Sequence, residues 1–157
     1  MKLTPKTIRT AKIPPLPRDL DLHVIARKRE LNTIPKQYLS QAYLRQRNVF
    51  GQTVFHEAAA EGSLEQIPLA LLTTKNLMNC NADGKRVLGI AASHGYLNQV
   101  PSEVLTLENL LKNDQVGVSA IHHAAISGNL QQIPEKYLTE ETVLTYMLKV
   151  EHIVFLC

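Results

Sequence analysis

The chain has 157 residues and a net charge of +3, and its 45% hydrophobic and 20% charged residues argue for one folded domain rather than general disorder. No run of 18 or more apolar residues occurs, so the sequence predicts no membrane span. The two cysteines, Cys80 and Cys157, are too few for a disulfide framework, and we expect a reduced, cytoplasmic protein in which both act as small hydrophobic residues.

The charge is divided unevenly along the chain. Residues 1–47 carry 11 basic and 3 acidic residues, a net charge of +8, whereas residues 48–157 carry 6 and 11, a net charge of −5. Residues 1–19 are predicted to form a basic arm that contains proline, and its "IPPLPRD" stretch favours an extended segment that covers the start of the domain. No apolar segment follows its lysines, so the arm does not resemble a secretory signal.

A period of 33 residues runs through the rest of the chain. Ile/Val-Pro pairs recur at this step, as Ile34-Pro35, Ile67-Pro68, Val100-Pro101 and Ile133-Pro134. The same step relates Leu31, Leu64, Leu97 and Leu130, as well as Ala26, Ala59, Ala92 and Ala125, and also Gly62, Gly95 and Gly128. The sequence therefore predicts four copies of one structural unit, at about 15–47, 48–80, 81–113 and 114–146.

Each copy is predicted to hold two helices. In the second copy a turn at Gly51 precedes an alanine-rich helix, and Gly62 ends that helix in the left-handed conformation. Pro68 suits the first turn of a second helix over "PLALLTTKNL", and Thr73 can cap one more turn that ends near Leu77. One copy cannot close its own core, whereas stacked copies can. We therefore expect Leu97, in an internal copy, to be buried.

The second copy, with its pattern G-x-T-x-x-H-x-A-A-x-x-G-x-L, resembles the ankyrin repeat. The residues that carry the resemblance are Gly51, Thr53, His56, Ala58, Ala59, Gly62 and Leu64, and in the fourth copy Gly117, Ser119, His122, Ala124, Ala125, Gly128 and Leu130. The third copy departs from the pattern at Arg86 and Gly89, and in the first copy Arg29 stands at the position of the capping glycine.

The resemblance covers roughly residues 20–145 and implies an all-α protein, an α-solenoid of stacked helix-turn-helix repeats. The links between copies read as more helical than extended, so we expect short or absent β-hairpins. The family uses the shared histidine, here His23, His56 and His122, to tie adjacent loops together by hydrogen bonds.

The sequence offers no catalytic or metal-binding motif. The adjacent pair His122-His123 would point about 100° apart on a helix, and no C-x-x-C or H-x-x-x-H pair is present. Phosphate-binding loops and nucleophile elbows are also absent, and the pair Glu140-Glu141 suits the first turn of a helix. We therefore expect neither an enzyme nor a bound metal or cofactor.

The resemblance implies a protein-binding module that uses loop tips and the exposed ends of the first helices. By position, these candidates are Arg47, Val49, Phe50, Gln52, Glu61, Asp83, Lys85, His94, Gln115, Val116, Val118 and Ile126. Phe50 is either an exposed anchor or a ring that folds inward. The partner is an unidentified protein, and we expect a monomer rather than a homodimer.

Two alternatives remain open. The basic cluster Arg27, Lys28 and Arg29 could contact nucleic acid or another anionic surface, or it could be the solvated face of a capping copy. A further alternative is an inhibitor or regulatory subunit of an enzyme.

The apolar end, 146–157, aligns with the opening of a fifth copy, and we expect it to fold back onto the fourth copy rather than mediate association.

Overall fold

The computed structural model describes residues 13–141, and this part of the chain is all-α. Its α-helices are α1 (Leu22–Arg27), α2 (Gln41–Leu44), α3 (Val54–Glu61), α4 (Thr74–Leu77), α5 (Val87–His94), α6 (Leu107–Leu111) and α7 (Ala120–Ile126). Its 3-10 turns are η1 (Leu31–Thr33), η2 (Lys36–Tyr38), η3 (Leu64–Gln66), η4 (Leu69–Leu71), η5 (Leu97–Gln99), η6 (Leu130–Gln132) and η7 (Glu135–Tyr137). Residues 13–141 contain no helix long and apolar enough to cross a bilayer.

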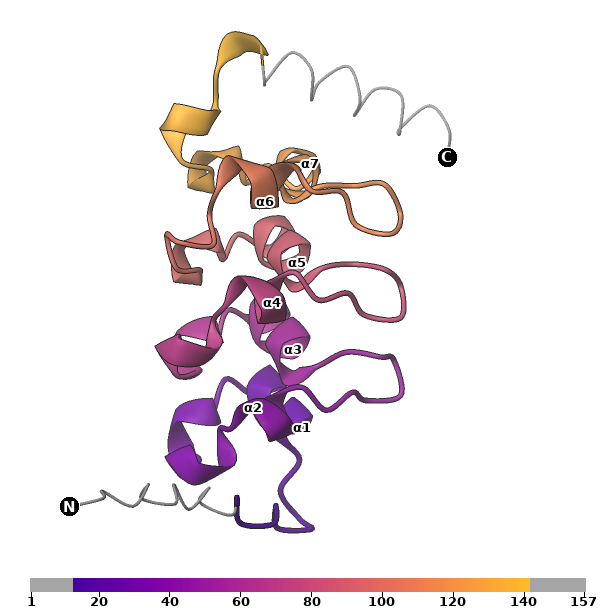
Figure 1. Cartoon of the computed structure of the whole chain (residues 1–157), viewed down its shortest axis with the longest axis vertical. Helices are drawn as coiled ribbons and strands as arrows, with labels where there is room; N and C mark the ends of the chain where they lie inside the picture. The colour runs from indigo at the N-terminus through magenta and orange to yellow at the C-terminus, as the bar shows by residue number, and fades with distance from the viewer. Residues whose placement is uncertain (1–12, 142–157) are drawn as a thin grey trace, which may run out of the picture.

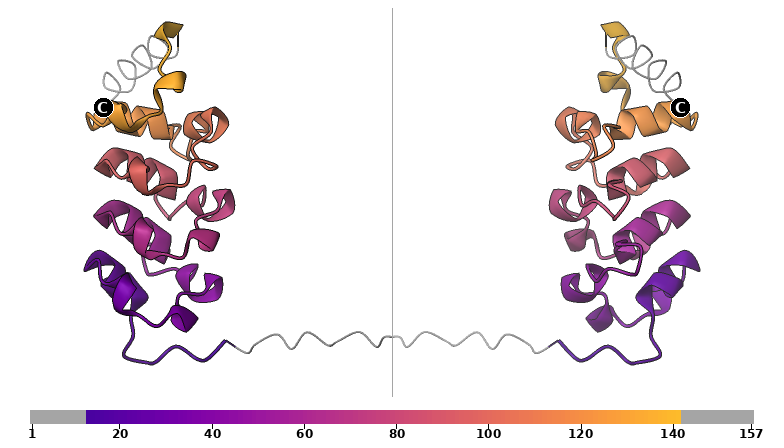
Figure 2. Two further views of the ribbon diagram at one scale, coloured as in Figure 1. Left: turned by 90° about the vertical axis from the view of Figure 1, so that its left-hand side faces the viewer. Right: turned by 90° about the vertical axis from the view of Figure 1, so that its right-hand side faces the viewer.

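The longer helices pack one on the next, in the order α1, α3, α5 and α7 (Figure 1). Loops project from one side of this column, while the short 3-10 turns form a second column beside the helices (Figures 1 and 2). The predicted low sheet content is confirmed for residues 13–141, which hold one isolated bridge, between Cys80 and Arg86, and no strand.

The first helix of a copy is set by signals at both of its ends. At the start of α3, the backbone N–H of Thr53 donates to Nδ1 of His56, and the Thr53 hydroxyl lies 2.8 Å from the same nitrogen. Ser119 and His122 form the same capping box at the start of α7. Gly62 ends α3 with φ of 71°, as predicted, because glycine adopts the left-handed conformation without steric cost.

The predicted second helix is wrong in its first half. Pro68 does not begin an α-helix but has an extended ψ of 127°, and it is followed by the single 3-10 turn η4. The residue before a proline is disfavoured in the α region, and Ile67 is extended too, with ψ of 138°. The second half of the prediction is confirmed, because the Thr73 hydroxyl accepts from Asn76 N–H and α4 ends at Leu77.

The core is built by the side chains that repeat. Leu31, Leu64 and Leu97 are completely buried, which confirms the prediction for Leu97. Paired alanines such as Ala58 and Ala59 are also fully buried, and their small size lets neighbouring helices approach closely. The aliphatic and alanine-rich composition is therefore what stacked short helices require.

Neighbouring copies are held in register by a glutamine that the sequence analysis did not single out. Gln99 accepts from the N–H of Leu64 at 3.0 Å and donates to the carbonyl of Gly62 at 2.9 Å, so one side chain satisfies two backbone groups of the preceding copy. Gln132 makes the equivalent two bonds to Leu97 and Gly95. Gln66, Gln99 and Gln132 recur at the same 33-residue step, and this recurrence was the signal that could have revealed them.

The N-terminal end of the column is covered by residues of the arm. Leu16 of the arm packs against the core, as does Leu20 directly after the arm, and the hydroxyl of Tyr43 donates to the carbonyl of Pro14. The rest of the predicted arm and the predicted apolar cap at 146–157, with Cys157, lie outside the described residues.

Candidate binding surface

The loops that join successive copies share one construction. In the first loop, Oδ1 of Asn48 accepts from the backbone N–H of Phe50 and of Gln52, at 2.9 and 3.0 Å. Asp114 does the same in the third loop, where it accepts from Val116 and Val118 at 3.0 and 2.9 Å. Asn or Asp at this position makes the loop satisfy its own backbone. The conformation of these loops is consequently fixed by hydrogen bonds within the loop.

Adjacent loops are also bonded to each other. The N–H of Ala82 in the second loop donates to the carbonyl of Phe50 in the first, at 3.3 Å. The N–H of Gln115 in the third loop donates to the carbonyl of Gly84 in the second, at 3.1 Å. These bonds align the loop tips in a row along one side of the column, where the loops project in Figure 1. We call residues 47–52, 80–85 and 113–118 the loop row.

Apolar side chains stand exposed on this row and beside it. The exposed fraction is 92% for Val49, 65% for Phe50 and 58% for Val116, and it is 54% for Ile126 at the end of α7. Phe50 therefore points outward, and the alternative of an inward-folded ring is wrong. These four account for most of the six large hydrophobic side chains that are exposed within residues 13–141.

The predicted polar residues of the surface divide into two groups. Asp83, Lys85 and Gln115 in the loop row are exposed, as are Glu61 and His94 at the ends of α3 and α5. Val118 is half-buried. The Nδ1 of His94 lies 3.0 Å from the carbonyl of Ile90, in its own helix. The first group therefore has side chains open to a partner, and two of them, Asp83 and Lys85, belong to the middle loop, between the loops that carry Phe50 and Val116.

Arg47 and Gln52 belong to the second group, because their polar atoms are used inside the loop row. Arg47 donates to the carbonyl of Gly51, to the carbonyl of Cys80 at 2.8 Å and to Oδ1 of Asn79 at 2.9 Å. Gln52 accepts from Nδ2 of Asn48 at 3.3 Å. Arg47 thus joins the first loop to the second, which is a structural role that residue position alone did not indicate.

Beneath the exposed side chains lie two buried polar groups that the sequence analysis missed. The buried carboxylate of Glu57 accepts from Arg27 and from Asn48, both at 2.9 Å. Two copies later, at the same repeat positions, Nε2 of His123 lies 3.1 Å from Oδ2 of Asp114. In each case a helix side chain is bonded to a loop side chain nine residues earlier, so these pairs attach the loop to the helix face.

The third copy holds Gly89 at the position of His56 and His122, and the structure gives a physical reason for this difference. A Cβ on Gly89 would lie 2.9 Å from Cδ2 of His123. The imidazole of His123, in the next copy, therefore occupies space that a larger residue at Gly89 would need.

The basic cluster of the first copy is largely used within the fold. Arg27 pairs with Glu57, and Arg29 donates to the carbonyl of Gly62 at 3.3 Å. Arg29 also has φ of 61°, the left-handed conformation that glycine adopts at this position in later copies. Lys28 is exposed. These three residues therefore do not form a large unpaired basic patch.

The capping box of α3 depends on a neutral imidazole at His56. Burial, and to a smaller extent the nearby charge of Arg47, lower the pKa of His56 from 6.5 to about 4. The backbone of Asn79 and Lys85, in the next loop, lies beside the ring and acts in the opposite direction. Because a neutral ring can accept at Nδ1, the Thr53 N–H keeps its acceptor at neutral pH.

Within residues 13–141, no three His, Cys, Asp or Glu side chains come together as the ligands of a metal ion would. Cys80 is a free thiol of intermediate exposure. The candidate binding surface is therefore a row of hydrogen-bonded loops with exposed apolar and polar side chains. A comparison with models of protein families and with curated proteins found no match for this sequence.

Proposed function

We propose that this chain is an ankyrin-like α-solenoid that binds a protein partner through the loop row and the adjoining ends of α3, α5 and α7, and that it has no catalytic activity of its own. The repeat of 33 residues and the packing of α1, α3, α5 and α7 support this assignment. The observation that carries it is the exposure of Val49, Phe50 and Val116 on loops whose backbone is bonded internally and from loop to loop.

That combination favours binding for a physical reason. A partner that covers these side chains gains the removal of apolar surface from water, and the loops lose little conformational freedom on binding because they are already ordered. Exposed aromatic residues that are held in place are the side chains that most often dominate protein interfaces. The charged residues Asp83 and Lys85, in the middle loop, would then select among partners rather than supply most of the affinity.

The test compares proteins captured from a lysate of the source organism by three forms of the chain. The double variant Phe50→Ser, Val116→Ser should lose proteins that the wild-type chain captures, and Gln131→Ala, an exposed change on a 3-10 turn, should keep them. A protein recovered in this way, once purified, should bind the double variant at least about tenfold more weakly, since truncated anchor residues typically cost that much or more. Melting temperatures should agree between the three forms. Equal affinity for the wild type and the double variant would exclude the loop row as the binding surface.

The alternative function is nucleic-acid binding through the basic cluster of the first copy, and a second experiment distinguishes it from protein binding through the loop row. Arg27 and Arg29 are hydrogen-bonded within the fold, which favours the loop row over the basic cluster. Binding of a labelled duplex should be measured at 50 and 200 mM salt, because affinity that comes from phosphate contacts falls steeply over this range. We expect the affinity for the duplex to be the same for the wild type and for Lys28→Gln. If the affinity falls steeply with salt and Lys28→Gln also abolishes binding, the nucleic-acid alternative is established. Monomeric state and a reducing, cytoplasmic compartment are part of the proposal, and light scattering tests the first of these.

A further inference from the structure

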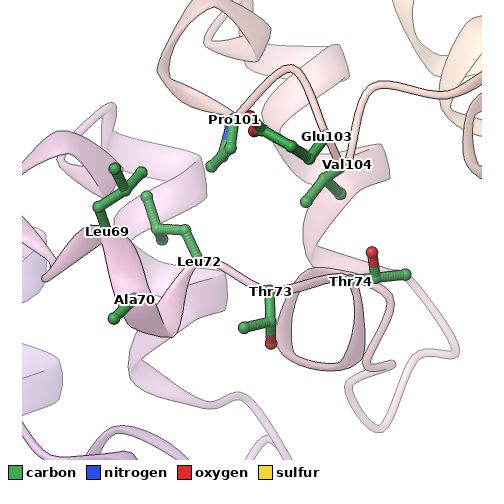
Figure 3. A pocket seen from close by; sticks show the side chains of 8 residues that line it. All are labelled: Leu69, Ala70, Leu72, Thr73, Thr74, Pro101, Glu103 and Val104. Carbon is green, nitrogen blue, oxygen red and sulfur yellow. The ribbon is translucent and has the colours of Figure 1, made fainter.

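A groove of about 370 Å³ lies between residues 69–74 of the second copy and 101–104 of the third. Figure 1 shows the 3-10 turns of these copies on the side of the column away from the projecting loops. Leu69 and Leu72 line one side of it, and Pro101 and Val104 approach from the other, with Thr73 and Thr74 along its length (Figure 3). Leu72 and Val104 are buried, whereas Leu69 is 73% exposed. The groove therefore combines an apolar floor with one aliphatic side chain that stands in solvent.

The same local bonds fix the chain on both sides of the groove. In the second copy, Nδ2 of Asn76 donates to the carbonyl of Leu71 at 2.7 Å. In the third copy, Nδ2 of Asn109 donates to the carbonyl of Val104 at 2.8 Å. The helices that follow are capped by Thr73 and Thr106. The groove is thus preformed, and an occupant would not have to order its walls.

The boundary between the second and third copies differs from its neighbours in residue type. The position of Leu69 holds Lys36 in the first copy, Ser102 in the third and Glu135 in the fourth. The position of Glu103 holds Lys136 in the fourth copy, and this ammonium lies 4.7 Å from the centre of the Tyr137 ring. An aliphatic wall and an acidic side chain therefore meet at this boundary, whereas the corresponding positions at the other two boundaries hold different combinations.

Among the described residues that line the groove, Glu103 is the only charged one, and it is exposed. The adjoining segments, 64–77 and 97–112, add exposed Glu65 and Glu108 and, with the opposite charge, exposed Lys75 and Lys112, so the carboxylate of Glu103 is the charge that an occupant of the groove meets. The volume is at the small end of the range for binding pockets, which fits one or two aliphatic side chains rather than a whole small molecule. The apolar depth and the carboxylate of Glu103 together select a basic segment with aliphatic side chains.

We propose that this groove docks a short basic segment of a second protein, which inserts an aliphatic side chain between Leu69 and Val104 and places a Lys or Arg beside Glu103. This interaction is separate from the one proposed for the loop row, because the two surfaces lie on opposite sides of the column. A chain with both surfaces would hold two proteins, or two parts of one protein, at the same time.

The test uses a fluorescein-labelled peptide of lysine and leucine, with leucines every three or four residues, and two matched peptides in which serine replaces leucine or glutamate replaces lysine. The wild-type chain should bind the first peptide at least about tenfold more tightly than either of the others. Leu69→Ser should lower affinity for the first peptide at least about tenfold, as expected for losing the contacts of a leucine that is exposed in the free chain and that the peptide covers. Glu103→Gln should lower it by a smaller factor that disappears at high salt.

The repeat itself supplies the folding controls. Ser102 and Gln37 are the natural residues at the positions of Leu69 and Glu103 in other copies, so both variants should keep the melting temperature of the wild type. Glu135→Gln removes one exposed charge from the fourth copy and should leave peptide affinity unchanged. Equal binding of the leucine and serine peptides, no binding of the first peptide, or no effect of Leu69→Ser would overturn the proposal. A wild-type dimer that Leu69→Ser converts to a monomer in light scattering would also overturn it, because the occupant would then be a second copy of this chain.

Discussion

The three glycines that follow the first helices provide a graded test of how the copies pack. Gly62, Gly95 and Gly128 have similar left-handed φ values of 71°, 81° and 73°. They differ in what a Cβ would contact. At Gly62 it would lie 2.5 to 2.7 Å from three ring carbons of Tyr96, whereas at Gly95 its nearest neighbour is Oδ1 of Asn129 at 3.1 Å. At Gly128 nothing within residues 13–141 lies closer than 4 Å.

Substitution by alanine should therefore separate the backbone cost from the packing cost. An L-residue in the left-handed region costs about 1–2 kcal/mol, and this cost is common to all three variants. Carbon atoms are normally about 3.5–4.0 Å apart, so the Tyr96 ring must move by roughly 1 Å, and such overpacking costs about 1–3 kcal/mol more. We expect a loss of about 2–5 kcal/mol for Gly62→Ala and about 1–2 kcal/mol for Gly128→Ala, with Gly95→Ala between them.

Urea unfolding followed by circular dichroism measures these losses directly. The double variant Gly62→Ala, Tyr96→Ser should be more stable than the sum of the two single changes predicts, because the ring that the new methyl group meets has gone. Serine is the residue at this position in the preceding copy, Ser63. Equal losses for Gly62→Ala and Gly128→Ala, together with simple additivity in the double variant, would refute the packing argument.

Two further changes test the hydrogen bonds between copies and the buried imidazole. Gln99→Ala removes the acceptor of Leu64 N–H and the donor to the Gly62 carbonyl, so the free energy of unfolding should fall by about 1–3 kcal/mol, while exposed Gln131→Ala should stay within about 0.5 kcal/mol of wild type in the same urea assay. Because the folded pKa of His56 lies below its unfolded value, the unfolded state binds more protons between about pH 6.5 and pH 4, and stability is full above this window and falls as the pH drops through it. The loss by pH 4 should be about 3 kcal/mol, and His56→Asn, although less stable at pH 7, should show a flatter pH profile in urea titrations.

The repeat unit could be predicted in large part because its signals are local. The left-handed end of α3 at Gly62 depends on the one residue type that adopts that conformation freely, and the turn capped by Thr73 depends on a hydroxyl that accepts from a backbone N–H three residues later. The predicted helix at Pro68 failed because a proline is compatible with both a helix start and an extended residue before a 3-10 turn. The conformations of Ile67 and Pro68 decide between the two, and only the folded chain determines them.

The sequence by itself determined the period, the end of the first helix of the second copy at Gly62 and the burial of Leu97, since these follow from short-range backbone preferences repeated every 33 residues. The candidate binding residues were found by position in the repeat, but only the tertiary structure separated Phe50, which is exposed, from Arg47, which joins two loops. The tertiary structure also decided that Gln99 bonds to the preceding copy. A long polar side chain can reach either solvent or a neighbouring copy. Which of the two it contacts depends on how the copies stack, and the stacking is established by residues that are distant along the chain.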